Sequence, residues 1–91
     1  VGYFVFMSKT TVGTCGKITI WIDDKIAGYL TEDYTGSFSN CTTPPIDGKL
    51  LKIIAPVGTH TVRVSVDNDC RKFNTDTYSL KQGVCRYYSL N

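Results

Sequence analysis

Residues 16–30, "GKITIWIDDKIAGYL", decide the fold class of this chain. Three isoleucines of the stretch stand at alternate positions: Ile18, Ile20 and Ile22. Because successive side chains of a β-strand point to opposite faces, this alternation predicts a strand with one apolar face and with Trp21 on the other. A tight turn near Asp24 and Lys25 is expected to follow, and "KIAGYL" then returns as a second strand. The stretch therefore predicts a β-hairpin.

The same alternation recurs along the rest of the chain, whereas a sustained helical period is found nowhere. Five further runs show it: "GYFVFMSK" at 2–9, "KLLKIIAP" at 49–56, "HTVRVSVD" at 60–67, "DTYSLK" at 76–81 and "CRYYSLN" at 85–91. Residues 31–48 are rich in Thr, Ser, Gly, Pro and Asn, which predicts a long loop. Seven short strands in 91 residues predict one domain, 1–91, an all-β antiparallel sandwich of immunoglobulin-like size.

The four cysteines predict a disulfide-stapled domain from an oxidising compartment. They are Cys15, Cys41, Cys70 and Cys85. A structural zinc site is not favoured, since no C-x-x-C pair is present. Of the three possible pairings, proximity favours Cys15 with Cys41 and Cys70 with Cys85, each bridge stabilising the fold by about 3 kcal/mol. We therefore expect a secreted or cell-surface protein, and a first residue other than Met suggests a processed product or a piece of a longer polypeptide.

Charge and hydropathy argue against two classes of partner. The formal net charge is +2, and Arg71-Lys72 is the only adjacent basic pair, so no basic stripe is available to follow a nucleic-acid backbone. No apolar run approaches the ~20 residues that span a bilayer, so membrane insertion is not expected either.

The single histidine, His60, is predicted to be structural. It shares the parity of Val62 and Val64 at the start of an inward-facing run, where its ring nitrogens can bond to backbone groups. Enzyme activity is not expected, because the chain has no serine elbow, no cysteine expected to be a free thiol and no second histidine for a metal triad. No cofactor or metal site is predicted, since the acids at 23–24 and 67–69 fit turns better than a calcium site.

The two stretches "ITIWIDDKIAG" and "APVGTHTVRVSV" resemble the small PEGA-type and related β-sandwich modules of bacterial surface and secreted proteins. The matching positions are Ile20, Ile22, Asp23, Gly28, Gly58, His60, Val62 and Val64. The chain departs from that pattern at Asp24 and Lys25, where a turn glycine is usual, in its long cysteine-bearing loop and in its final hairpin. The resemblance implies an extracellular accessory or adhesive module, and it carries over no site residue.

Two functional hypotheses follow. In the first, the domain binds a carbohydrate or a protein surface through exposed aromatics, with Trp21 as the main residue and Tyr34 or Tyr87 extending the platform. The alternative for Trp21 is that it lies in the core or beneath a neighbouring loop. In the second hypothesis the domain is a structural subunit or a repeating module of a self-assembling cell-surface or extracellular filament, joined through its terminal or edge strands. Asn40 heads an N-x-T sequon, "NCT", and is a possible glycosylation site in the predicted loop.

Overall fold

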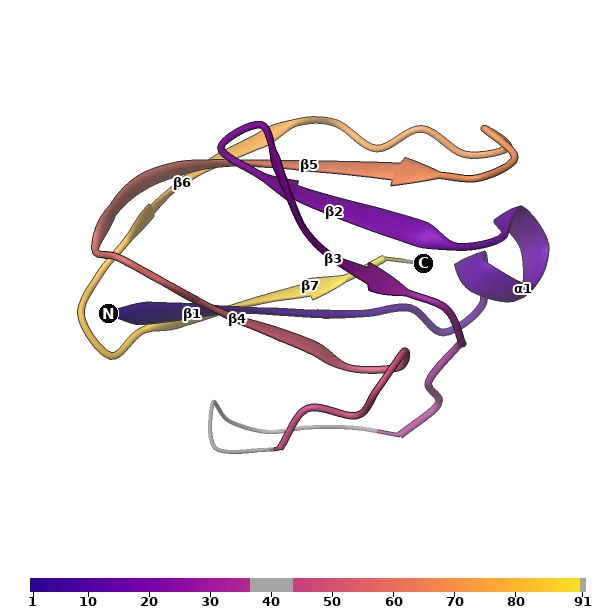
Figure 1. The fold of residues 1–91 in the computed structure, drawn as a ribbon, viewed down its shortest axis with the longest axis horizontal. Helices are drawn as coiled ribbons and strands as arrows, with labels where there is room; N and C mark the ends of the chain where they lie inside the picture. The colour runs from indigo at the N-terminus through magenta and orange to yellow at the C-terminus, as the bar shows by residue number, and fades with distance from the viewer. Residues whose placement is uncertain (37–43, 91) are drawn as a thin grey trace.

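The computed structural model describes residues 1–36 and 44–90, which form two facing β-sheets (Figure 1). In chain order the elements are β1 (Gly2–Met7), α1 (Thr11–Cys15), β2 (Ile18–Ile22), β3 (Lys25–Leu30), β4 (Leu51–Ala55), β5 (Gly58–Val66), β6 (Asp76–Leu80) and β7 (Cys85–Ser89). Each of the seven predicted strands is present. Most are a few residues shorter than predicted, whereas the strand at 25–30 has its predicted bounds and β5 begins earlier than predicted. The prediction of an all-β sandwich is therefore confirmed.

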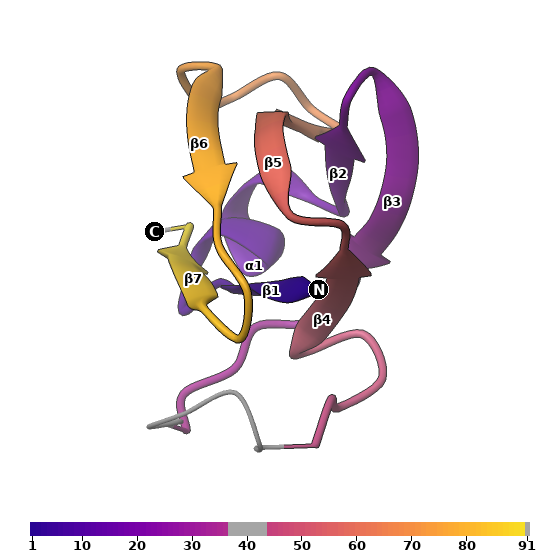
Figure 2. The same cartoon turned by 90° about the vertical axis from the view of Figure 1, so that its left-hand side faces the viewer.

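One layer contains β4, β1 and β7, and the other contains β3, β2, β5 and β6, each in that order (Figure 2). The four-stranded sheet is antiparallel throughout and joins the β2–β3 pair to the β5–β6 pair through β2 and β5. In the other sheet β1 is antiparallel to β4 but parallel to β7. The expectation of a wholly antiparallel sandwich is wrong at this pair, because the chain crosses from one sheet to the other between β6 and β7.

The core lies between the sheets and takes the isoleucine face of β2. The side chains that are fully buried there include Phe4, Phe6, Ile18, Ile20, Leu30 and Leu80. Phe6 of β1 stacks on Tyr88 of β7, with ring centroids 5.0 Å apart. Full burial of one such side chain is worth about 1.5–3 kcal/mol, so these residues are a major source of stability.

The β2–β3 hairpin turns at Asp23 and Asp24, one residue earlier than predicted. Both residues have positive φ, 53° and 65°, which is the signature of a two-residue type I′ turn. A bulge follows: Ile20 pairs with Gly28 but Trp21 pairs with Ile26, so Ala27 is an extra residue. The bulge reverses the alternation in β3 and places Ile26 on the same face as Trp21.

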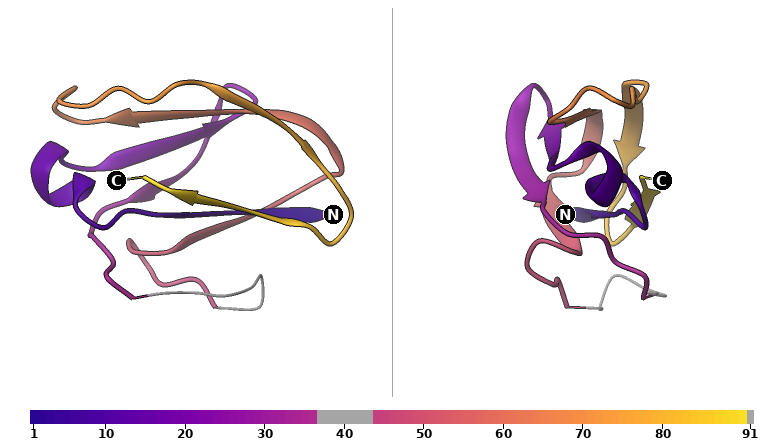
Figure 3. Two further views of the ribbon diagram at one scale, coloured as in Figure 1. Left: turned by 180° about the vertical axis from the view of Figure 1, so that it is seen from behind. Right: turned by 90° about the vertical axis from the view of Figure 1, so that its right-hand side faces the viewer.

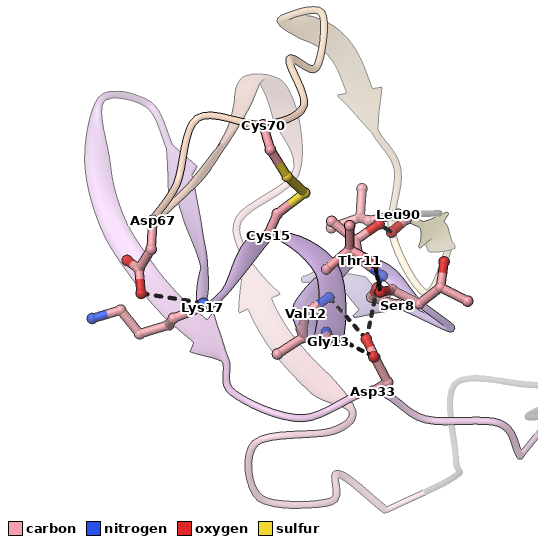
Figure 4. Close-up of a disulfide and its surroundings, with 12 residues drawn as sticks. Ser8, Thr11, Val12, Gly13, Cys15, Lys17, Asp33, Asp67, Cys70 and Leu90 are labelled. Carbon is pink, nitrogen blue, oxygen red and sulfur yellow. Dashed lines mark hydrogen bonds between the residues drawn. A yellow bond between two sulfur atoms is a disulfide. The ribbon is translucent and has the colours of Figure 1, made fainter.

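The short helix α1 was not predicted from the sequence, because five residues are too few to display a helical period. Side-chain bonds from distant segments hold it in place (Figure 4). The Asp33 carboxylate accepts the backbone N–H groups of Val12 and Gly13 at 2.9 and 2.8 Å. The Thr11 hydroxyl donates to the Leu90 carbonyl at 2.7 Å. These contacts tie α1 to the connection after β3 and to the end of β7.

A disulfide joins Cys15 at the end of α1 to Cys70 in the loop after β5, with Cα atoms 5.6 Å apart (Figure 4). The predicted pairings of Cys15 with Cys41 and of Cys70 with Cys85 are therefore wrong. The physical reason is the pairing of β2 with β5, which sets Ile18 opposite Val66 and so brings the residues before β2 beside those after β5. Cys85 is also disulfide-bonded, and Cys41 lies outside the described residues.

Candidate functional site

Trp21 lies on the outer face of the four-stranded sheet. Its neighbours Ile20 and Ile22 in β2 turn toward the core, and Trp21 is only partly buried. The orientation predicted from the alternation is thus the one observed. Trp21 is the only tryptophan of the chain.

Two residues of β5 fix the indole ring. Arg63 is the register partner of Trp21, and its guanidinium carbon Cζ lies 4.2 Å from the ring centroid, within cation–π distance. The indole N–H donates to the Ser65 hydroxyl oxygen at 3.2 Å. The ring is therefore held on the sheet surface by a stacked cation on its face and a hydrogen bond at its polar edge, a preorganised arrangement that costs little side-chain entropy on binding.

On the other side of Trp21, edge strand β3 adds apolar and aromatic surface. Ile26 is the register partner of Trp21 and is 50 % exposed. Tyr29, opposite Thr19, is 44 % exposed and has the Lys17 ammonium 4.7 Å from its ring centroid. We define the outer-face cluster as Trp21, Ile26, Tyr29 and Arg63. The cluster combines two aromatic rings, one aliphatic side chain and one cation on the outer face of the sheet.

The outer face of β5 and β6, beside this cluster, is lined with hydroxyl groups. Two pairs of opposite residues on these strands consist of threonine or serine: Thr59 lies opposite Ser79, and Thr61 lies opposite Thr77. The intervening His60 and Val62 face the core. The sheet therefore presents hydroxyl donors and acceptors next to its aromatic side chains.

Tyr34 and Tyr87 do not extend the Trp21 platform, because Tyr87 belongs to the opposite sheet and Tyr34, in the connection after β3, packs against that sheet. The Tyr34 side chain packs against a small buried cluster of Val5, Met7 and Leu50, on the outer side of the three-stranded sheet where residues 31–36 and 44–50 pass (Figure 3). Tyr87, 43 % exposed, is the register partner of Val5 on that same sheet. The expectation of one platform made by Trp21 with Tyr34 or Tyr87 is thus wrong, since sequence parity does not tell which sheet a strand joins.

His60 is structural in this arrangement. It is buried, its ring meets Phe4 edge-on with centroids 5.8 Å apart, and its Nε2 and Nδ1 lie 2.7 Å from the Pro56 carbonyl and 2.6 Å from the Asp23 carboxylate. Both partners are acceptors, so the doubly protonated ring satisfies both. The hydrogen bond to Pro56, followed by the one to Asp23, raises the pKa of His60 above 6.5. Burial of the ring acts in the opposite direction and lowers this pKa. The hydrogen bond between His60 and Asp23, and the one that the Thr61 N–H donates to Asp23, lower the pKa of Asp23 below 3.8.

We predict a pH dependence of stability from this pair. The His60 contribution is fully present below its unfolded pKa of about 6.5 and is lost as pH rises through the higher pKa of the folded state. The Asp23 contribution is present above its unfolded pKa and is lost as pH falls through its lowered folded pKa. The melting temperature of the wild type should therefore fall from about pH 6 to pH 9 more steeply than that of His60→Gln. Equal slopes in the two proteins would contradict the assignment.

The acidic residues at strand ends hold turns together. Asp23 accepts the Thr61 N–H at 3.0 Å, and Asp67 accepts the Lys17 N–H at 3.2 Å (Figure 4). Within residues 1–36 and 44–90, no group of three or more His, Cys, Asp or Glu side chains is arranged to hold a metal ion. The candidate glycosylation site Asn40 lies outside the described residues.

Comparison of the chain with protein-family models, with curated proteins and with solved structures finds no match. The resemblance to PEGA-type modules therefore stays a prediction. No helix in the described part of the chain has the length and apolar character that a membrane span requires. What the site can do is accordingly argued from the geometry of the outer-face cluster.

Proposed function

We propose that the domain is a non-catalytic extracellular module that binds carbohydrate through the outer face of its four-stranded sheet. The observation that carries the proposal is the position of Trp21, the one tryptophan of the chain, which lies outside the core and is fixed by Arg63 and Ser65. Aromatic residues with a polar edge are enriched at binding surfaces because they offer a large contact area at low entropic cost.

The surroundings of Trp21 suit a sugar. A sugar ring has apolar C–H faces and a rim of hydroxyl groups. The aromatic and aliphatic members of the outer-face cluster can contact the C–H faces, while Arg63 and the hydroxyl row of β5 and β6 can bond to the rim. The Cys15–Cys70 disulfide agrees with secretion into an oxidising compartment.

The test is a binding screen of the purified domain against a panel of neutral and acidic oligosaccharides. For each ligand found, Trp21→Ala should weaken affinity by roughly 5- to 150-fold, the effect of losing a stacking anchor worth about 1–3 kcal/mol. The matched control is Tyr87→Ala, which removes an exposed aromatic from the opposite sheet and should change affinity less than about twofold. Absence of binding across the panel, or an equal loss in the control, would refute the proposal.

A second candidate function is self-association into a filament. Its supporting observations are two exposed apolar residues and a pocket on the same molecule. Ile54 and Val57 are 65 % and 55 % exposed around the end of β4. A pocket of about 600 Å³, to which Tyr29, Ile46 and Leu51 contribute, lies where the connection from β3 enters β4. An apolar patch that fits a pocket elsewhere on the same molecule generates open head-to-tail contacts, and hence fibres.

Sedimentation velocity separates the two functions. A monomer at high protein concentration excludes the filament and leaves the sugar-binding function. Concentration-dependent growth that Val57→Asp abolishes would instead support the filament, because a carboxylate in the apolar contact is costly to desolvate.

A further inference from the structure

A small polar pocket opens beside Trp21, between β5 and the loop that follows it. Its volume is about 270 Å³, and its polar lining includes Arg63, Ser65, Asp69, Arg71, Lys72 and Thr75. Three of these side chains are cationic and one is a carboxylate. The pocket thus carries a net charge of +2 and lies at the end of the outer-face cluster, with Arg63 common to both.

The three cations of the pocket outnumber its one carboxylate, Asp69. Among the described residues, no carboxylate lies within ion-pair distance of Arg63, Arg71 or Lys72, in contrast to Arg86, which pairs with Asp76. Like charges gathered around a small depression produce a local positive potential, which an anion entering the depression relieves. The uncompensated charge therefore specifies the sign of the ligand.

Both guanidinium groups are held in place before any ligand arrives. Arg63 stacks on Trp21 at 4.2 Å, and Arg71 lies 5.1 Å from the ring centroid of Phe73. Cys70, next to Arg71, is tethered to α1 by the disulfide. Ser65 accepts the indole N–H through its oxygen, so its own O–H can donate to a ligand. A planar guanidinium group that is already held in place can donate two parallel hydrogen bonds to two oxygen atoms of a sulfate or carboxylate group.

We propose that this pocket binds a single oxyanion, and that the oxyanion is the sulfate or carboxylate group of an acidic polysaccharide. The pocket, with a volume of about 270 Å³, has room for such a group, and the hydroxyl row of β5 and β6 that adjoins it can bond to the sugar that carries the group. The identity of the carrier rests on the sugar-binding function proposed above. The proposal that an oxyanion binds here rests only on the net positive charge of the pocket and on its two stacked guanidinium groups.

Isothermal titration calorimetry tests the proposal with four probes: a sulfated heparin oligosaccharide, the same oligosaccharide after desulfation and reduction of its carboxylates, inorganic sulfate, and an oligo-glutamate peptide. We expect the sulfated sugar to bind most tightly. The double variant Arg71→Gln/Lys72→Gln should weaken that binding at least about tenfold. The control Lys25→Gln/Lys81→Gln removes the same charge from exposed positions elsewhere and should have less than about a twofold effect.

The probes separate failure of this proposal from failure of the sugar-binding function. Equal affinity for the sulfated and the neutralised sugar, or equal losses in the two double variants, would overturn the oxyanion pocket and leave sugar binding intact. Binding of inorganic sulfate alone that is weakened by Arg71→Gln/Lys72→Gln would support the pocket while refuting its carbohydrate carrier. Tighter binding of the peptide would likewise refute the carrier. Thermal melts of both double variants should match the wild type, which ensures that a loss of binding is not a loss of fold.

Discussion

Replacing Cys15 and Cys70 together with serine will lower the free energy of unfolding by about 4 kcal/mol. The two cysteines are separated by 55 positions, and a cross-link over a loop of that length restricts the unfolded chain by roughly this free energy. For a domain whose total stability is on the order of 5–15 kcal/mol, the loss is a large fraction. Urea titration of the double variant measures it.

The control for this experiment keeps the bridge. Thr14→Ser with Lys72→Ser alters one residue near each cysteine and should cost less than about 1 kcal/mol. A double serine variant as stable as this control would contradict the assignment. A peptide map without reduction gives a second readout, because it should contain a fragment joining Cys15 to Cys70, and it also identifies the partner of Cys85.

Loss of the bridge should reach the candidate site as well. The loop that carries Arg71 and Lys72 begins at Cys70, and the disulfide connects this loop to α1 beside the entry of β2. Releasing the tether leaves the pocket cations free to separate under their mutual repulsion. The disulfide therefore restricts the unfolded chain and also anchors to α1 the loop that carries Arg71 and Lys72.

Phe6→Ala will lower the free energy of unfolding by about 3–5 kcal/mol, the range expected for emptying a buried aromatic site. Phe6 is fully buried and stacks on Tyr88, so truncation removes buried area and leaves a cavity. Trp21→Ala removes a larger ring but should cost only about 1–2 kcal/mol, because the ring lies on the outer face and loses mainly the Arg63 stack and the Ser65 hydrogen bond. Denaturant titration of both variants gives the comparison. A larger loss for Trp21→Ala than for Phe6→Ala would place Trp21 in the core and remove the main residue of the proposed site.

The strands were predictable because each carries its own local signal. Period-two alternation in β2 and β5 also assigned the isoleucines, His60 and Val62 to the core face, where the structure places them. What could not be predicted is set by pairing between distant segments. The parallel β1–β7 pair and the Cys15–Cys70 bridge depend on which strands become neighbours, and proximity along the chain is a poor guide when β2 pairs with β5.

The candidate site was only partly predictable for the same reason. Trp21 stood out from the alternation of β2, whereas Arg63 and Ser65 become its neighbours through the register with β5, which no local pattern reveals. Ile26 reached the outer face through a bulge that reversed the alternation of β3. A strict alternation of faces along β3, without the bulge, would have placed Ile26 on the same face as Gly28, toward the core.

The measurement that tests the central claim most directly is an amide and indole NMR titration of the 15N-labelled domain with the tightest ligand of the oligosaccharide panel. The chain has one tryptophan, so its spectrum contains a single indole N–H signal, which comes from the outer-face cluster. We predict that this signal shifts during the titration together with the amides of Arg63, Ser65 and Arg71. Shifts confined to the opposite sheet around Val5 and Tyr87, with the indole signal unmoved, would contradict the account.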